Sequence, residues 1–200
     1  MSYRIAMSSL VALVLGVAVL TAGAVSPQQA DAFARKLAII SQQGTLALRA
    51  TGARRTAVTE TEVNSWFAYR AQPLLPQGMT EPQVTILGEG RVSGAATVDL
   101  EAVGKSRRSG GLLDPWSLLG GRLPVSVTGI LHTQNGRGRF ELQHAAVSGV
   151  PIPKALLQEL VSYYSRTPDD PAGINLDEMF ALPANIRQIE VGQGQAVVVQ

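Results

Sequence analysis

The sequence has 200 residues, the size of a single domain, and 46% of them are hydrophobic, which is enough to build a packed core. The formal net charge is only +2, so the composition does not indicate a basic face for nucleic acid. The chain has no cysteine, which excludes disulfide frameworks, thiolate metal sites and cysteine nucleophiles, and it has only two histidines.

Residues 1–24 have the pattern of an export segment. Arg4 is the only charged residue among the first 30, and an almost wholly apolar run follows it from Ile5 to Leu20. Ala22-Gly23-Ala24 then offers the small residues that a signal peptidase needs. Left uncleaved, the segment would be just long enough to span a bilayer. Both interpretations predict an exported protein, either periplasmic or anchored to the outer face of the inner membrane.

Residues 25–57 predict an N-terminal helix and a connector. Ser26-Pro27-Gln28-Gln29 is a typical helix start, apolar residues then recur at helical spacing, and Gly44 ends the run. The connector that follows has some strand character. A second capping box, Thr59-Glu60-Thr61-Glu62, predicts another helix, which Pro73 stops.

The rest of the chain, residues 58–200, predicts one α+β domain containing three β-hairpins. Strict alternation from Val92 to Leu100 places apolar residues on one face, and Gly88-Glu89-Gly90 forms the turn before it. The second hairpin turns at Asn135-Gly136, and the third turns at Gly192-Gln193-Gly194. A helix with a leucine stripe lies between the second and third hairpins. We expect a long, coiled antiparallel sheet of about six strands wrapped around this helix, with the N-terminal helices beside it.

Such a sheet and helix would enclose an apolar groove long enough for an acyl chain. The candidate lining residues come from the second helix, the strands and the leucine-rich helix: Trp66, Phe67, Val98, Val127, Phe140, Leu142, His144, Leu156, Leu160 and Tyr164. Trp66 and Phe67 fit core packing as well as a cavity wall. Alternation puts His144 on the apolar face, as a hydrogen-bonded core histidine or a polar contact in the cavity, although a bulge in the strand would turn it outward.

The segment between the first two hairpins is unusually apolar for a loop. It begins with a basic run and continues with leucines and a tryptophan: Lys105, Arg107, Arg108, Leu112, Leu113, Trp116, Leu118 and Leu119. Tryptophan and leucine beside basic residues are typical of contact with an anionic membrane surface. The same residues would suit a cap on one end of the core or the surface for an envelope protein.

Several short motifs resemble those of the LmeA-like family of exported phospholipid-binding proteins and, more distantly, the TULIP-like lipid-binding modules. They are Thr59-Glu60-Thr61-Glu62-Val63-Asn64, the hairpin over 84–100, Gly149-Val150-Pro151-Ile152-Pro153 with Ala155-Leu156-Leu157, and Leu182-Pro183. The likeness covers roughly residues 58–200, and it departs at 104–122 and at the acidic loop 168–178. It implies a half-pipe sheet around a helix, with lipid between them, and it supplies no catalytic residues.

No motif in the chain predicts catalysis. There is no G-x-S-x-G, the two glycine turns lack the Lys-Ser/Thr of a phosphate loop, and the acidic loop lacks the spacing of an EF-hand. We therefore expect a non-enzymatic binding module for a lipid or other apolar ligand, without cofactor, metal or nucleic acid. The alternative is a ligand-free interaction or scaffold subunit of an envelope complex. A contiguous apolar cavity favours the first hypothesis, and a fully packed core favours the second.

Overall fold

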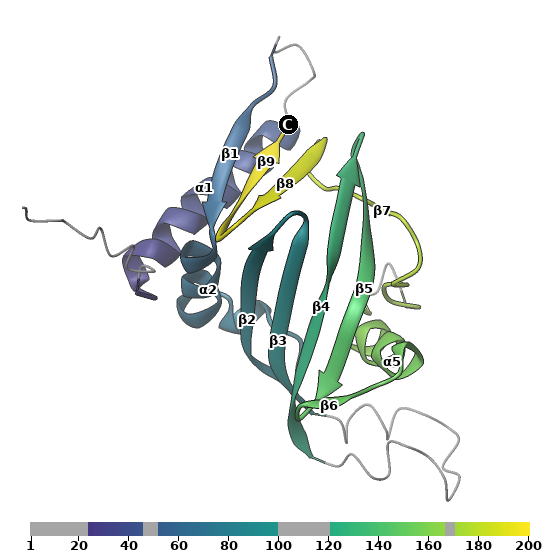
Figure 1. Cartoon of the computed structure of the whole chain (residues 1–200). Helices are drawn as coiled ribbons and strands as arrows, with labels where there is room; N and C mark the ends of the chain where they lie inside the picture. The colour runs from purple at the N-terminus through teal and green to yellow at the C-terminus, as the bar shows by residue number, and fades with distance from the viewer. Residues whose placement is uncertain (1–23, 46–51, 100–120, 167–170) are drawn as a thin grey trace, which may run out of the picture.

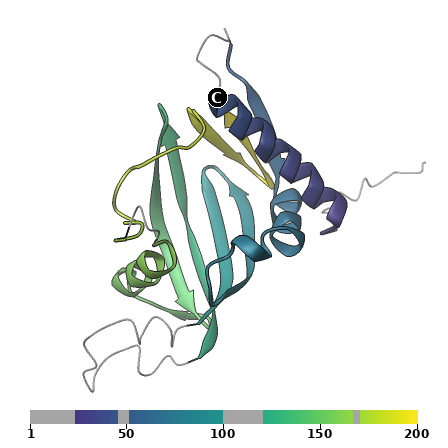
Figure 2. The same cartoon turned by 180° about the vertical axis from the view of Figure 1, so that it is seen from behind.

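A computed structural model describes residues 24–45, 52–99, 121–166 and 171–200. It confirms the predicted α+β class, with a six-stranded antiparallel sheet and helices packed beside it (Figure 1). Seen from behind, helices α1 and α5 both stand in front of the strands (Figure 2). The helices therefore cover one face of the sheets, as one-faced strands require.

The larger sheet is built from the first two predicted hairpins. Its strands follow the order β2-β3-β4-β5-β6, and β7 also pairs with β5. The bounds are Met79–Gly88 for β2, Arg91–Asp99 for β3, Arg122–Gln134 for β4, Arg137–Val147 for β5, Val150–Pro151 for β6 and Phe180–Ala181 for β7. Directly paired residues share a face, so the pairs Val98↔Leu123 and Val125↔Val147 define an inner, apolar face.

The third hairpin does not join this sheet as we expected. Its strands β8 (Gln188–Gly192) and β9 (Gln195–Val199) form a separate three-stranded sheet with β1 (Arg55–Thr59), in the order β1-β9-β8. The connector supplies the missing partner, since β1 pairs with β9 from Arg55↔Val199 to Thr59↔Gln195. Strand β1 thus lies across the predicted boundary at residue 57.

The Thr133 side chain occupies the hydrogen-bonding edge of β8 that faces the larger sheet. Thr133 of β4 donates its hydroxyl to the Ile189 carbonyl at 2.9 Å, and the Ile189 amide donates back at 2.8 Å. Because Thr133 satisfies both backbone groups of Ile189, the two sheets meet without continuous strand pairing.

Both predicted N-terminal helices form where the capping residues place them. Helix α1 spans Pro27–Thr45, and helix α2 spans Glu60–Tyr69 with a complete capping box between Thr59 and Glu62. Helix α1 packs against α2 and covers the smaller sheet, where Ile40 joins Leu182 and Ile186 in one buried cluster. A short 3-10 turn, η1 (Gln72–Leu74), follows α2.

Helix α2 also closes the open edge of β2. The Asn64 side chain donates to the Val84 carbonyl and accepts from the Val84 amide, both at 2.8 Å. The Glu60 carboxylate accepts from the Ile86 amide at 2.7 Å. These polar side chains take the place of a neighbouring strand, which protects the edge from pairing with another chain.

A buried ion pair ties α1 to α2. The Glu62 side chain is only 8% exposed, and Lys36 Nζ lies 2.7 Å from both of its carboxylate oxygens. Burial raises the pKa of Glu62, but the hydrogen bonds from Lys36 and Thr59 outweigh it and hold the pKa below its ordinary value. Glu62 is therefore ionised in the folded protein.

Acid should weaken this junction. A carboxyl whose pKa is lowered by folding adds stability above its unfolded pKa, and this contribution is lost as the pH falls through the folded value. We expect Glu62→Gln to lower the free energy of unfolding by about 1–3 kcal/mol at pH 7 and to flatten its decline below about pH 4.5. Urea melts at both pH values would measure this. Glu141→Gln, which changes an exposed carboxylate, is the control. Equal losses of unfolding free energy in both variants would contradict the role of Glu62.

Candidate functional site

An apolar groove lies over the inner face of the larger sheet, between α2 and α5 (Lys154–Tyr164). Figure 2 shows the two helices and the strands of the larger sheet from behind. The groove has a volume of about 270 Å³. Its lining comes from α2, β2, β3, β4 and α5: Phe67, Met79, Pro82, Gln83, Val84, Gly94, Ala95, Ala96, Val98, Val125, Val127, Leu157, Leu160, Val161 and Tyr164.

Helix α5 forms one wall because its leucine stripe packs onto the sheet. Leu157 is 1% exposed, and Leu160 belongs to the buried cluster of Val98, Val125 and Val147. At the end of the helix, the Tyr164 hydroxyl donates to the Asp99 carbonyl at 2.7 Å. Burial raises the pKa of Tyr164, so the phenol keeps the proton that makes this bond.

Gly94 leaves part of the hollow open because it has no side chain. Gly94 sits mid-strand on the inner face, paired with Val84 on one side and Val127 on the other. A Cβ atom at this position would find only the Gln83 carbonyl oxygen within 4 Å, at 3.9 Å. A methyl group at this position would therefore meet no clash.

The lining determines what the groove can do chemically. It contains no charged side chain, and its polar side chains are Gln83 and Tyr164. The groove can bury hydrocarbon, but it offers no acid–base pair. Its volume lies just below the range of about 300–1,000 Å³ typical of pockets for drug-sized ligands, so it suits one apolar chain better than a whole two-chain lipid.

Half of the predicted lining residues do line the groove: Phe67, Val98, Val127, Leu160 and Tyr164. Leu156 instead packs against the core cluster beneath α5. The Trp66 ring contacts Phe33 at 5.8 Å and Phe67 at 5.6 Å between centroids, so it supports the wall from behind.

The three predictions on β5 need correction. Phe140 and Leu142 share the inner face but lie beyond the groove, where the Phe140 ring occupies the space over Gly129. His144 is exposed on the opposite face. The pairing jumps from Thr128↔His144 to Gly129↔Leu142, so β5 bulges between them, and this inverts the alternation that the sequence predicted.

Sequence reasoning missed other lining residues, among them Met79, Pro82, Val84, Leu157 and Val161. The alternation in β2 was enough to predict Val84 as a lining residue, and the leucine stripe of α5 was enough to predict Leu157. Pro82 lies within a bulge of β2, next to Glu81 with its φ of 53°, and a proline inside a strand pattern was the available signal for that bulge. The predicted contact residues from Lys105 to Leu119 lie outside the described residues.

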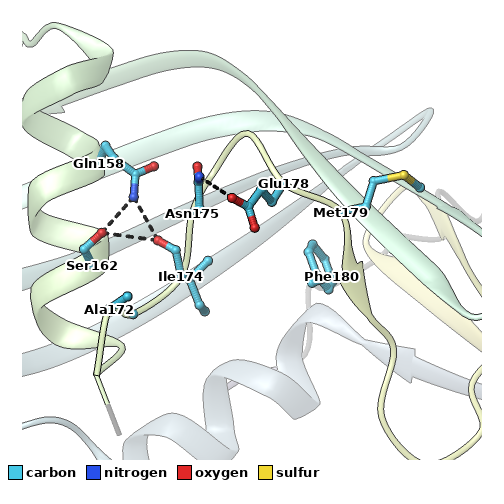
Figure 3. A pocket seen from close by; sticks show the side chains of 9 residues that line it. Gln158, Ser162, Ala172, Ile174, Asn175, Glu178, Met179 and Phe180 are labelled. Carbon is cyan, nitrogen blue, oxygen red and sulfur yellow. Dashed lines mark hydrogen bonds between the residues drawn. The ribbon is translucent and has the colours of Figure 1, made fainter. Parts of the chain in front are cut away.

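A second pocket, of about 510 Å³, lies between α5 and residues 172–180, the segment that leads into β7 (Figure 3). The Gln158 side-chain Nε2 donates to the Ile174 backbone carbonyl at 2.9 Å, and the Leu176 backbone amide donates to the Gln158 side-chain Oε1 at 2.8 Å. Glu178 accepts from Asn175 at 2.8 Å. These polar groups bond to one another, so we regard the pocket as bracing for α5.

Within the described ranges, no three histidine or acidic side chains gather closely enough to hold a metal ion. None of the helices described there is both long and apolar enough to cross a membrane.

The fold and groove define the chain as an α+β domain with a one-sided sheet and an apolar groove beneath a helix. Comparison with protein-family models, curated protein sequences and solved structures found no match for it.

Proposed function

We propose that this protein is an exported, non-catalytic lipid- or amphiphile-binding module of the cell envelope, whose groove holds one apolar chain. The observation that carries this proposal is the uncharged hollow at Gly94, walled by α2 and α5. Roughly six CH₂ groups buried there would contribute about 5 kcal/mol. That is enough for reversible binding and release, as lipid transport would require.

The export pattern of residues 1–24 and the resemblance to LmeA-like proteins point in the same direction. A protein outside the cytoplasm that carries an apolar chain needs no cofactor, and the groove lining has no nucleophile beside a base.

Filling the groove tests the proposal. Gly94→Leu should place a branched side chain in the hollow, displace about three to four CH₂ groups and weaken binding of a fluorescent fatty acid roughly a hundredfold. Stability should be largely preserved, because the Cβ atom meets no clash and the rest of the side chain would extend into the groove that Gly94 lines. The measurement is fluorescence titration, with thermal melting alongside.

Thr85→Leu is the matched control, because it adds the same side chain to the exposed outer face of the neighbouring strand. It should leave the affinity unchanged. Equal affinity in Gly94→Leu and the wild type would disprove binding in this groove.

The second candidate function is a ligand-free interaction or scaffold subunit. The modest volume of the groove favours it, since about 270 Å³ is small for a dedicated lipid carrier. Native mass spectrometry of the protein expressed in bacteria separates the two functions. A copurifying lipid that is lost in Gly94→Leu supports binding, and a chain without any ligand supports the scaffold.

A further inference from the structure

Four arginines from three separate segments gather at one end of the molecule. Backbone hydrogen bonds hold these segments together. The Gln200 amide donates to the Arg54 carbonyl at 2.9 Å, and the Arg187 amide donates to the Val199 carbonyl at 2.8 Å. The Gly136 amide then donates to the Arg187 carbonyl at 2.9 Å, which brings in the turn of the β4–β5 hairpin. Figure 1 shows this end at the top, where β9 ends and the hairpin turns. We call Arg54, Arg137, Arg139 and Arg187 the arginine tip.

The arginine tip carries unbalanced positive charge. All four residues are exposed, and none has an ion pair or side-chain hydrogen bond within the described chain. Two carboxylates line the same hollow as Arg137 and Arg139: Glu190 pairs with Arg55 at 2.9 Å, and Glu141, which lies 3.0 Å from His132, offsets no more than one of the four charges. Folding alone gives no reason to concentrate these charges, since like charges repel.

Exposed apolar side chains border the same end. Phe180 of β7 pairs with Gly138 and its ring lies over that glycine, on the face opposite to Arg137 and Arg139, whereas Met179 lines the same hollow as the two arginines. Met179 precedes Phe180 and is 54% exposed. Arginines beside exposed apolar side chains are suited to a lipid surface, where phosphate groups lie outermost and hydrocarbon lies just beneath them.

We propose that the arginine tip docks on an anionic phospholipid bilayer. Guanidinium groups bind phosphate oxygens in bidentate fashion, and each basic residue near an anionic membrane adds an attraction that salt screens. Met179 enters the interfacial zone beside Arg137 and Arg139. The inference does not depend on the groove, whose lining contains none of these residues.

Vesicle cosedimentation of the full chain tests the docking. The vesicles are phosphatidylcholine alone and phosphatidylcholine mixed with phosphatidylglycerol, at low and high salt. The wild type should prefer the anionic vesicles, and salt should remove the preference. Arg137→Gln, Arg139→Gln and Arg187→Gln combined should weaken binding to the anionic vesicles roughly a hundredfold. Binding to phosphatidylcholine, which measures any contribution of the apolar N-terminus, should not change.

Two further variants separate position from total charge and from folding. Arg35→Gln, Arg91→Gln and Arg166→Gln combined remove the same charge from exposed arginines elsewhere and should bind nearly as the wild type does. Lysine at the three tip positions should keep affinity within a few-fold. Equal losses in both glutamine triples, or no loss in the tip triple, would overturn the proposal. Gly94→Leu should still bind vesicles, so a failure of the groove would be recognised separately.

Discussion

Gly129→Ala is expected to destabilise the protein by about 3 kcal/mol or more. A Cβ atom at Gly129 would lie 2.4 Å from the Glu141 carbonyl oxygen and 2.5 Å from the Phe140 ring. A ring can shift, but Glu141 is paired with Ile130 of β4 just beside the bulge of β5, and moving its carbonyl would disturb that pairing. Urea melts would show the loss as a lower midpoint at an unchanged slope.

Gly94→Ala is the matched control for this prediction. Both glycines lie mid-strand on the inner face of the same sheet, but the new Cβ at Gly94 would make only an ordinary contact, 3.9 Å from the Gln83 carbonyl oxygen. Gly94→Ala should therefore be neutral or slightly stabilising, because glycine costs about 0.5–1 kcal/mol in a strand interior. Similar losses at the two positions would show that the close approach of Glu141 and Phe140 is not what makes Gly129 necessary.

Leu157→Ala should cost about 2–5 kcal/mol. Leu157 is 1% exposed and fixes α5 on the inner face, so truncation leaves a cavity between helix and sheet. If α5 opens locally before the rest of the chain unfolds, the same change will also raise protease cleavage near the helix. Thermal and urea melts measure the loss, and limited proteolysis locates it.

Val150→Ala provides the comparison, because Val150 lies just before α5 but is 64% exposed. Its effect should stay within about 0.5 kcal/mol. A loss below about 1 kcal/mol in Leu157→Ala would mean that α5 is held mainly by the polar contacts of Tyr164 and Gln158.

The secondary structure could largely be predicted because its signals are local. The capping residues of Thr59-Glu60-Thr61-Glu62 and the turn at Asn135-Gly136 act within a few neighbouring residues, and both appear in the structure. Alternation likewise placed Val98 and Val127 on the inner face, since side chains in an unbroken strand change sides at every residue.

Other features depend on contacts between distant residues, so only the tertiary structure decided them. One extra residue in β5 moved His144 to the outer face, and the partner of the last hairpin was a connector more than 100 residues away. Gly94 and Gly129 look alike in sequence, yet one opens the groove and the other admits a ring and a carbonyl. The arginine tip exists only after β1, β5 and the segment before β8 meet, because no local pattern brings charges from separate segments to one surface.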